Sequence, residues 1–157
     1  MNTTLCYIQH VGNYLMMLRN KKDHDVNQDK YVGVGGKFLP GETADECLVR
    51  EVKEETGYDL SSFDFRGVVH FVSDAWEDED MYLYTASVSD SPEPLPVPQC
   101  NEGTFFWIPI ADVENLPTWE GDKYFLHAIA AGRHGIDMTL EYAGDMLVRV
   151  QDVSDSR

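Results

Sequence analysis

The chain has 157 residues, of which 43% are hydrophobic and 11% aromatic, so it can enclose one ordinary core and is expected to form a single domain over residues 1–157. Its formal net charge of −16 excludes a simple electrostatic grip on polymeric DNA or RNA, which needs clustered Lys and Arg. An acidic protein can still bind a small polyphosphate when a metal cation lies between its carboxylates and the phosphate oxygens.

The N-terminal third is predicted to contain short strands. Two apolar segments, residues 5–8 and 14–18, flank the turn-like residues 9–13 and predict a strand, a turn and a strand. After the polar residues 20–30, residues 31–38 combine β-prone side chains with three glycines. Such a glycine-rich strand indicates a place where another backbone or a ligand approaches closely.

A helix of roughly four turns is predicted next. Thr43 and Glu46 have the spacing of a capping box, and Gly57 supplies a stop signal after the glutamates that precede it. The sequence therefore predicts a helix that begins after Thr43 and ends before Gly57.

The remaining elements predict a sheet with one more helix. Residues 65–72 and 81–88 are typical of paired strands, joined by an acidic connection over residues 74–80. A proline-rich loop at 91–98 precedes a strand at 104–108.

A second helix is expected at residues 123–131, and residues 138–150 resemble a hairpin that turns at 143–145. This mixture of strands with two helices predicts an α+β fold, an α/β/α sandwich with a mixed β-sheet.

The first predicted helix carries a group of carboxylates. Successive residues of an α-helix advance by about 100°, so Glu51, Glu54 and Glu55 share one face at the border of the apolar side. Crowded carboxylates that lose hydration need compensation, and a divalent cation would supply it. The alternative is a solvated, glutamate-rich helix with Arg50 and Lys53 as ion-pair partners.

A longer pattern surrounds this helix and reads G-x5-E-x7-R-E-V-x-E-E-x-G-Y. Its fixed positions are Gly36, Glu42, Arg50, Glu51, Glu54, Glu55 and Gly57. The pattern resembles the signature of the Nudix hydrolase family over its whole length. Only Tyr58 departs, where an aliphatic residue is usual, and that is a packing position.

The resemblance implies a loop-helix-loop that presents ligands to one or more Mg²⁺ ions, with Mn²⁺ as a substitute. The implied ligands are the side chains of Glu51, Glu54 and Glu55 and the carbonyl of Gly36, hard oxygen donors that suit this metal. Arg50 is expected to orient a glutamate, and Glu42 to hold the loop against the helix.

Hydrolysis of a phosphoanhydride also requires a group that accepts the proton of the attacking water. Glu54, Glu51 and Glu102 are all candidates, because the family does not use one fixed base. Glu102 lies just before a predicted strand, similar to the position from which some Nudix enzymes bring a distant base or metal ligand. The alternative is a plain loop carboxylate.

Two further segments, residues 31–37 and 117–122, resemble the MutT-type branch that destroys oxidised purine nucleoside triphosphates. The resemblance implies that Trp119 stacks on the base and that Asp122 reads the purine edge, with Glu120 as a nearby alternative. Trp119 could instead be a core anchor.

Other positions bear on the substrate less directly. Related enzymes often have an asparagine where this chain has Val32, which cannot form a hydrogen bond through its side chain. Arg19 matches a basic position that contacts phosphate, with Lys37 in a similar role, although a solvated cation is an equal alternative for Arg19. The acidic residues 76–80 are interpreted as solvated surface in preference to the border of a cleft.

The cysteines and apolar runs indicate the compartment. The three cysteines form an odd set without C-x-x-C spacing, which favours neither a disulfide framework nor a zinc cluster. No segment approaches membrane-spanning length, and no basic region followed by an apolar run begins the chain. A cytoplasmic protein without a membrane partner is expected.

The sequence thus predicts a Mg²⁺-dependent nucleoside triphosphate pyrophosphohydrolase, monomer or homodimer, whose partner is a small nucleotide. The favoured reaction converts 8-oxo-dGTP or a related oxidised purine nucleotide to the monophosphate and pyrophosphate. One alternative keeps the fold but takes a nucleotide sugar, a dinucleoside polyphosphate or an RNA 5′-end as substrate. Another is a non-catalytic nucleotide-sensing module, which the complete glutamate pattern opposes.

Overall fold

A computed structural model of the chain describes residues 1–21 and 27–153, so part of the polar stretch predicted at 20–30 lies outside the described residues. The strands are β1 (Asn2–His10), β2 (Asn13–Leu18), β3 (Tyr31–Val32), β4 (Val34–Lys37), β5 (Ser62–Ser73), β6 (Glu79–Ser87), β7 (Thr104–Pro109), β8 (Ile136–Ala143) and β9 (Met146–Asp152). The helices are α1 (Ala44–Thr56), the 3₁₀ helix η1 (Ile110–Asn115) and α2 (Asp122–Ala130).

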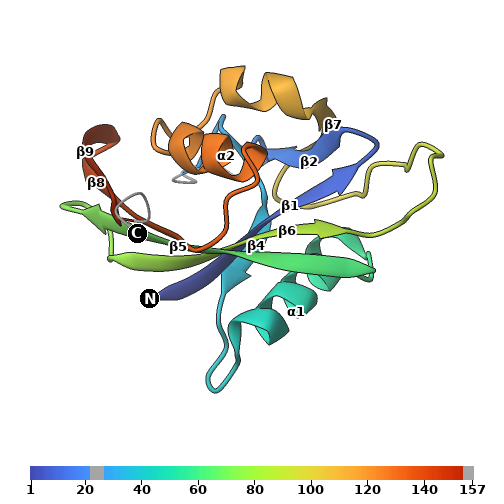
Figure 1. The fold of residues 1–157 in the computed structure, drawn as a ribbon, viewed down its shortest axis with the longest axis horizontal. Helices are drawn as coiled ribbons and strands as arrows, with labels where there is room; N and C mark the ends of the chain where they lie inside the picture. Colours follow the sequence, from blue (N-terminus) through green and yellow to red (C-terminus); the bar gives the residue numbers. More distant parts are fainter. Residues whose placement is uncertain (22–26, 154–157) are drawn as a thin grey trace.

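All of these strands belong to one mixed sheet (Figure 1). The strand order is β3-β2-β1-β6-β5-β8-β9, with β4 also paired to β1 and β7 to β2. The pairs β1–β6 and β5–β8 are parallel, whereas the other pairs are antiparallel. The predicted β5–β6 pair and the β8–β9 hairpin are confirmed.

Helices cover both faces of this sheet, with α1 on one side and α2 and η1 on the other (Figure 1). Alternate residues of β1 and β2 therefore enter two different cores. Tyr7 and Met16 pack in the cluster that includes Phe125 of α2, whereas Ile8 and Leu15 pack in the cluster beneath α1. The α/β/α sandwich with a mixed sheet is confirmed, and the period-2 alternation is what places side chains in both layers.

Helix α1 begins and ends where the sequence signals predict. The Thr43 hydroxyl accepts a hydrogen bond from the Glu46 N–H at 3.2 Å, and the Glu46 carboxylate accepts from the Thr43 N–H at 3.0 Å. Gly57 ends the helix in the left-handed region at φ 78°, and its N–H donates to the Lys53 carbonyl. A side chain at that φ would be strained, so glycine suits the position.

Two features of the middle of the chain differ from the sequence prediction. Residues 31–38 do not form one strand, because the chain changes partner at Gly33: β3 pairs with β2, and β4 pairs with β1. The 3₁₀ helix η1 between β7 and α2 was not predicted, since a short i to i+3 helix has little periodicity to reveal it.

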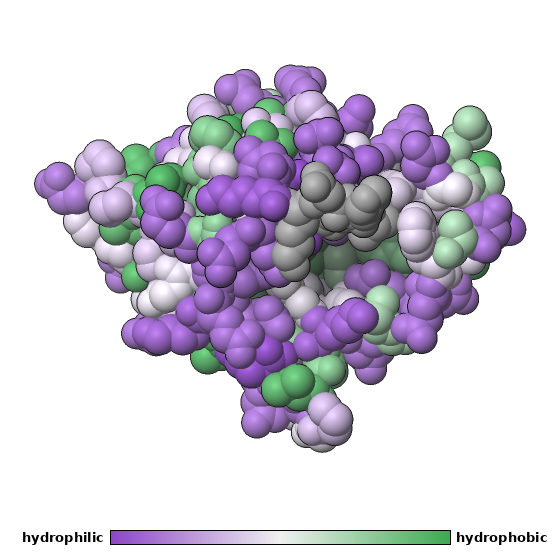
Figure 2. All heavy atoms as spheres, turned by 180° about the vertical axis from the view of Figure 1, so that it is seen from behind, coloured by the Kyte–Doolittle hydropathy of each residue, from purple (hydrophilic) through white to green (hydrophobic). Residues whose placement is uncertain are grey.

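Hydrophilic side chains cover most of the face shown in Figure 2, and hydrophobic ones are visible inside a hollow near its centre. Among the described residues, no helix is both long enough and apolar enough to cross a membrane.

Candidate active site

A cavity of about 880 Å³ is lined by residues of both α1 and α2, although these helices cover opposite faces of the sheet. Glu51 and Glu55 come from α1, and Asp122 comes from α2. The glycine-rich β4 and the first residues of β1 form part of the wall between them. The cavity therefore has two chemically different ends, one rich in carboxylates and one rich in aromatic rings.

Three carboxylates meet at the α1 end. Glu51, Glu55 and Glu102 all line the cavity, which brings Glu102 to the helix across about fifty residues of sequence. Glu102 also forms an ion pair with Arg19, another lining residue, at 3.5 Å. Glu54 is different: its side chain is 59% exposed, against 15% for Glu51, and it does not line the cavity.

Arg50 connects Glu51 to Glu42 and Glu54 through one guanidinium. Its Nε and Nη2 donate to the two oxygens of Glu42 at 2.8 and 2.9 Å, a bidentate pair. Its Nη1 donates to Glu51 at 2.8 Å and to Glu54 at 3.1 Å, and Nη2 also reaches the Lys37 carbonyl at 3.0 Å. One side chain thus ties the glycine-rich strand and the loop after it to the helix, the support role expected for Arg50 and Glu42.

Gly36 lets the Glu51 carboxylate stand against the backbone of β4. A methyl group placed on Gly36 would come within 2.5 Å of the Glu51 carboxyl carbon. Any side chain here would have to push the carboxylate away. The glycine of the sequence pattern is therefore explained by close approach to Glu51.

Burial and mutual repulsion disfavour charge on the carboxyls in the cavity. Burial, with the neighbouring Glu51 and Glu102 charges, raises the pKa of Glu55 to about 8, although the Gly35 N–H donates to it at 3.2 Å. Burial also raises the pKa of Glu51. Glu42 behaves in the opposite way, because hydrogen bonds from Arg50 lower its pKa to about 2.

The donor set at this end suits a divalent cation that prefers oxygen. Buried Glu55 is surrounded mainly by other carboxylates, so its negative charge calls for a cation. In the described part of the chain, however, no group of three or more His, Cys, Asp or Glu residues is already arranged to hold a metal ion. Arg50 and Arg19 instead form ion pairs with three glutamates, Glu51, Glu54 and Glu102. The chemistry fits a metal, and the present side-chain positions are those of an ion-paired cluster.

Trp119 dominates the other end of the cavity. Its indole N–H donates to the Asn27 side chain at 2.7 Å, and the Tyr142 ring meets it edge-on with centroids 5.2 Å apart. The Lys30 ammonium lies 4.6 Å from the centroid of the Trp119 ring, a cation–π contact. Trp119 packs against the α2 core, as a core anchor would, and it also lines the cavity, where its stacking on a base stays a prediction.

Asp122 is the buried polar group of this end. Its side chain lines the cavity, only 7% of the residue is exposed, and its carboxyl forms no hydrogen bond with another described residue. Burial, with a contribution from the Glu79 charge, raises its pKa to about 8, against the opposing effect of Lys30. At neutral pH this carboxyl is therefore largely protonated and can donate as well as accept a hydrogen bond.

Of the other residues expected in the site, some line the cavity and one does not. Arg19, Lys37 and Val32 line the cavity. Glu120 is exposed and lies outside the lining, so the structure favours Asp122 over this alternative.

Residues 76–80 fit both interpretations of the acidic loop: all but Glu79 are exposed, and Trp76, Glu77 and Glu79 also line the cavity. The β5–β6 hairpin brings them there, and a charge run carries no signal of that. Sequence reasoning also missed Asn27 and Tyr142, which lie in the lining next to Trp119. Asn27 lines the same cavity as Val32 and brings a side-chain amide to it.

Comparisons with known proteins agree with this geometry. The sequence matches the NUDIX domain family over residues 3–129. It is 27% identical over 141 residues to the uncharacterised Nudix hydrolase YvcI of Bacillus subtilis (strain 168), covering 88% of this chain and 89% of that protein.

Two solved structures show the same fold. The mutator MutT protein from Bacillus halodurans matches with a TM-score of 0.80 at 22% identity, covering 96% of each chain. The NUDIX domain of Shewanella oneidensis NrtR, solved with ADP-ribose, matches with a TM-score of 0.66 at 16% identity, covering 84% of this chain and 87% of that one.

Proposed function

The chain belongs to the NUDIX domain family of hydrolases, and from that premise we propose that it is a Mg²⁺-dependent nucleoside triphosphate pyrophosphohydrolase. Its favoured substrate is 8-oxo-dGTP or a related oxidised purine nucleotide, and its products are the nucleoside monophosphate and pyrophosphate. The observation that carries the proposal is that one cavity joins the glutamates of α1 to Trp119 and Asp122. Its volume of about 880 Å³ is in the range of small-molecule sites.

At the α1 end, the residues that would hold the metal are Glu51, Glu54, Glu55, Glu102 and the carbonyl of Gly36. Bound by these residues, Mg²⁺ would supply neutralisation of phosphate charge and activation of water. Glu54 is exposed and tied to Arg50 at 3.1 Å, so it would join the ligands by turning away from that contact.

Side chains of the protein orient the catalytic carboxylates and accept the proton of the attacking water. Arg50 orients Glu51 and Glu54, and one of Glu51, Glu54 and Glu102 accepts the proton of the water that attacks phosphorus. A P–O bond of the phosphoanhydride breaks as the new P–O bond forms, and pyrophosphate leaves with the electron pair. Arg19 and Lys37 contact the phosphate oxygens from the cavity wall.

At the opposite end, Trp119 and Asp122 recognise the base. The Lys30 ammonium lies over the Trp119 ring, so a purine that stacks on that face takes its place. The protonated Asp122 carboxyl has both a donor and an acceptor to offer to the edge of the purine. An unpaired buried carboxyl discriminates against rings that cannot complete its hydrogen bonds.

A substrate panel in the presence of Mg²⁺ tests the proposal. The panel contains 8-oxo-dGTP, dGTP, ADP-ribose, a dinucleoside polyphosphate and a 5′-triphosphate RNA, and kcat/KM and the products are measured for each. We expect the highest kcat/KM for 8-oxo-dGTP, with pyrophosphate as a product. A higher value for ADP-ribose, the dinucleoside polyphosphate or the 5′-triphosphate RNA rejects the sanitising role, and no turnover of any substrate favours a sensing module.

The metal requirement is tested separately, by removing divalent ions with a chelator and restoring Mg²⁺ or Mn²⁺. We expect activity to disappear and return. The single domain, the oligomeric state and the cytoplasmic location expected from the sequence remain predictions.

A further inference from the structure

Four aromatic residues line the cavity, and one of them differs from the others. Phe71 stacks on Tyr142 with centroids 6.4 Å apart, and Tyr142 meets Trp119 edge-on at 5.2 Å. These three rings therefore form one packed group. Trp76 is 54% exposed and has no ring contact with another described residue, yet it lines the same cavity. An exposed indole at a cavity wall is an unfilled contact surface.

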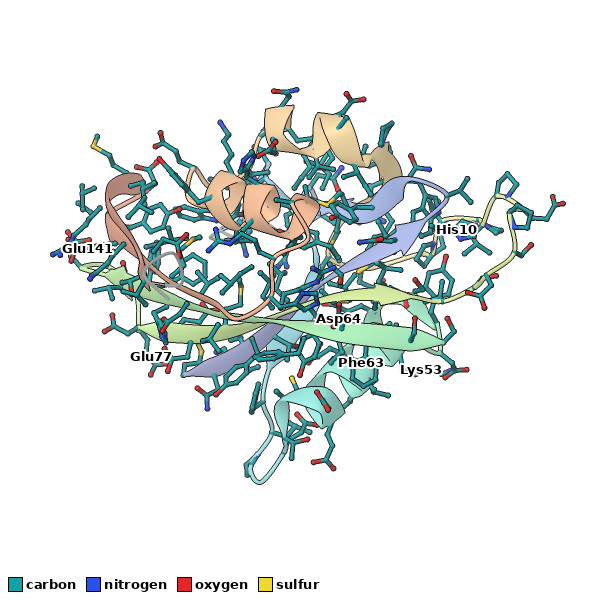
Figure 3. All side chains as sticks on the ribbon, viewed as in Figure 1. His10, Lys53, Phe63, Asp64, Glu77 and Glu141 are labelled. Carbon is teal, nitrogen blue, oxygen red and sulfur yellow. The ribbon has the colours of Figure 1, made fainter. Side chains whose placement is uncertain are left out.

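The Trp76 backbone is held in place at this wall. The Ser73 hydroxyl accepts hydrogen bonds from the Ala75 and Trp76 N–H groups at 3.0 and 3.1 Å, and the Ser73 N–H donates to the Asp78 carboxylate. Figure 3 places the neighbouring Glu77 at the end of the β5–β6 hairpin, on the opposite side of the picture from Lys53 of α1. The Trp76 indole therefore lines the cavity from an anchored backbone.

The hairpin end is also tied to two other parts of the chain. The Gly144 N–H donates to the Asp74 carboxylate at 2.8 Å, which links the connection to the turn between β8 and β9. The terminal amino group of Met1 donates to the Asp78 carbonyl at 3.2 Å. An anchored loop presents its side chain at a smaller entropic cost of binding than a loop that must first become ordered.

We propose that Trp76 stacks on the planar ring of the substrate and forms the outer wall of its base subsite. The inference deepens the proposed function and rests on it. Trp119 offers less free surface, because Lys30 covers one part of its ring and Tyr142 contacts another. Trp76 needs no such displacement. With Glu77 beside it, this wall suits a ring whose edge carries N–H donors, as purines with amino or imino groups do.

Binding of a nucleoside monophosphate, measured by calorimetry with Mg²⁺ present, tests this wall without any turnover. We expect W76A to weaken binding of 8-oxo-dGMP or dGMP about tenfold, and W76F to retain most of the affinity, because a smaller ring still stacks. W107F is the matched control, since Trp107 donates to the Leu95 carbonyl and does not line the cavity. Unchanged affinity in W76A overturns the proposal.

Kinetics separate stacking from a general disturbance of the site. For the preferred nucleotide, W76A should raise KM about tenfold and change kcat by less than about threefold, because a stacking ring has no part in the proton or phosphoryl transfer. Binding of inorganic tripolyphosphate, which has no ring, should be unchanged in W76A. Equal losses for the nucleotide and for tripolyphosphate would mean that Trp76 acts on the fold of the site, and would overturn the proposal.

The two proposals fail in different ways. If the substrate panel selects ADP-ribose, the oxidised-purine function is rejected, and the same W76A measurement with AMP then decides whether Trp76 stacks on a ring. If 8-oxo-dGTP is the preferred substrate and W76A binds its monophosphate as tightly as wild type does, the proposed function stands and the outer wall is rejected.

Discussion

The two ends of the cavity differ in how their carboxyl groups are paired with other side chains. At the α1 end, Arg50 donates to three glutamates and a carbonyl, and Arg19 pairs with Glu102, so most of the carboxylates have an arginine partner. At the α2 end, the buried Asp122 carboxyl has no hydrogen bond with another described residue. A tightly partnered cluster preserves the positions of reacting groups, whereas an unpartnered buried group makes binding depend on what the ligand supplies. Chemistry and selectivity are thus assigned to different ends.

The largest effect is expected from removing a charge at the α1 end. Glu55→Gln deletes the buried carboxylate that calls for a cation, and kcat should fall at least about 100-fold. Steady-state kinetics at saturating Mg²⁺ measure the loss. Asp59→Asn is the control, since Asp59 forms an ion pair with the exposed Lys53 and does not line the cavity. Wild-type turnover in Glu55→Gln would contradict metal catalysis at this helix.

Asp122→Asn is expected to act through selectivity, and more weakly. The amide can also donate and accept, but it cannot ionise, whereas the carboxyl can lose its proton and accept hydrogen bonds from two N–H groups of the purine edge. We therefore expect kcat/KM for the oxidised purine nucleotide to fall about 10–100-fold. Binding of inorganic tripolyphosphate should stay unchanged. Glu120→Gln provides the matched control, because Glu120 is exposed and outside the lining. An equal loss of kcat/KM in Asp122→Asn and Glu120→Gln would contradict a selective role for Asp122.

Gly36→Ala probes how closely the α1 end is packed. The added methyl displaces the Glu51 carboxylate, so the Mg²⁺ concentration for half-maximal activity should rise about tenfold. Direct titration of Mg²⁺ binding by calorimetry measures the same change without turnover. Ala44→Ser is the control, because Ala44 lies at the start of α1 and does not line the cavity. Gly41→Ala is unsuitable, because the φ of Gly41 is 77° and a side chain there would be strained. Unaltered metal affinity in Gly36→Ala would show that Glu51 does not need its present position.

The smallest effect is expected on the free energy of unfolding, which should depend on pH through one carboxyl at each end of the cavity. The folded-state pKa of Glu55 and of Asp122 is raised to about 8, from ordinary values of 4.5 and 3.8. Each group therefore contributes stability that is complete below its ordinary pKa and is lost as pH rises through about 8. In a chelator, the urea midpoint should fall between pH 6 and pH 9.

Variants and metal then separate the two contributions. Glu55→Gln and Asp122→Asn should each flatten part of the decline of the urea midpoint, whereas Mg²⁺ should suppress only the part due to Glu55. A midpoint that does not change between pH 6 and pH 9 in the wild-type protein would contradict both raised pKa values.

Much of the α1 end could be predicted from sequence because its parts are close along the chain. The capping box of Thr43 and Glu46, the stop at Gly57 and the ring of contacts around Arg50 all lie within 22 residues of Gly36. Helical geometry alone puts Glu51 and Glu55 on one side. It could not show that Glu54 points to solvent, because that depends on the strand packed beside the helix.

The α2 end depended on contacts that no local pattern reveals. Trp119 meets Asn27 from before β3 and Tyr142 from β8, and Trp76 reaches the same cavity from the β5–β6 hairpin. These residues are far apart in sequence, and only the order of strands in the sheet decides that they meet. The sequence by itself determined the helix, the alternation of the strands and the family. The tertiary structure decided which side chains share the cavity and which lose their water, since burial depends on packing between distant elements.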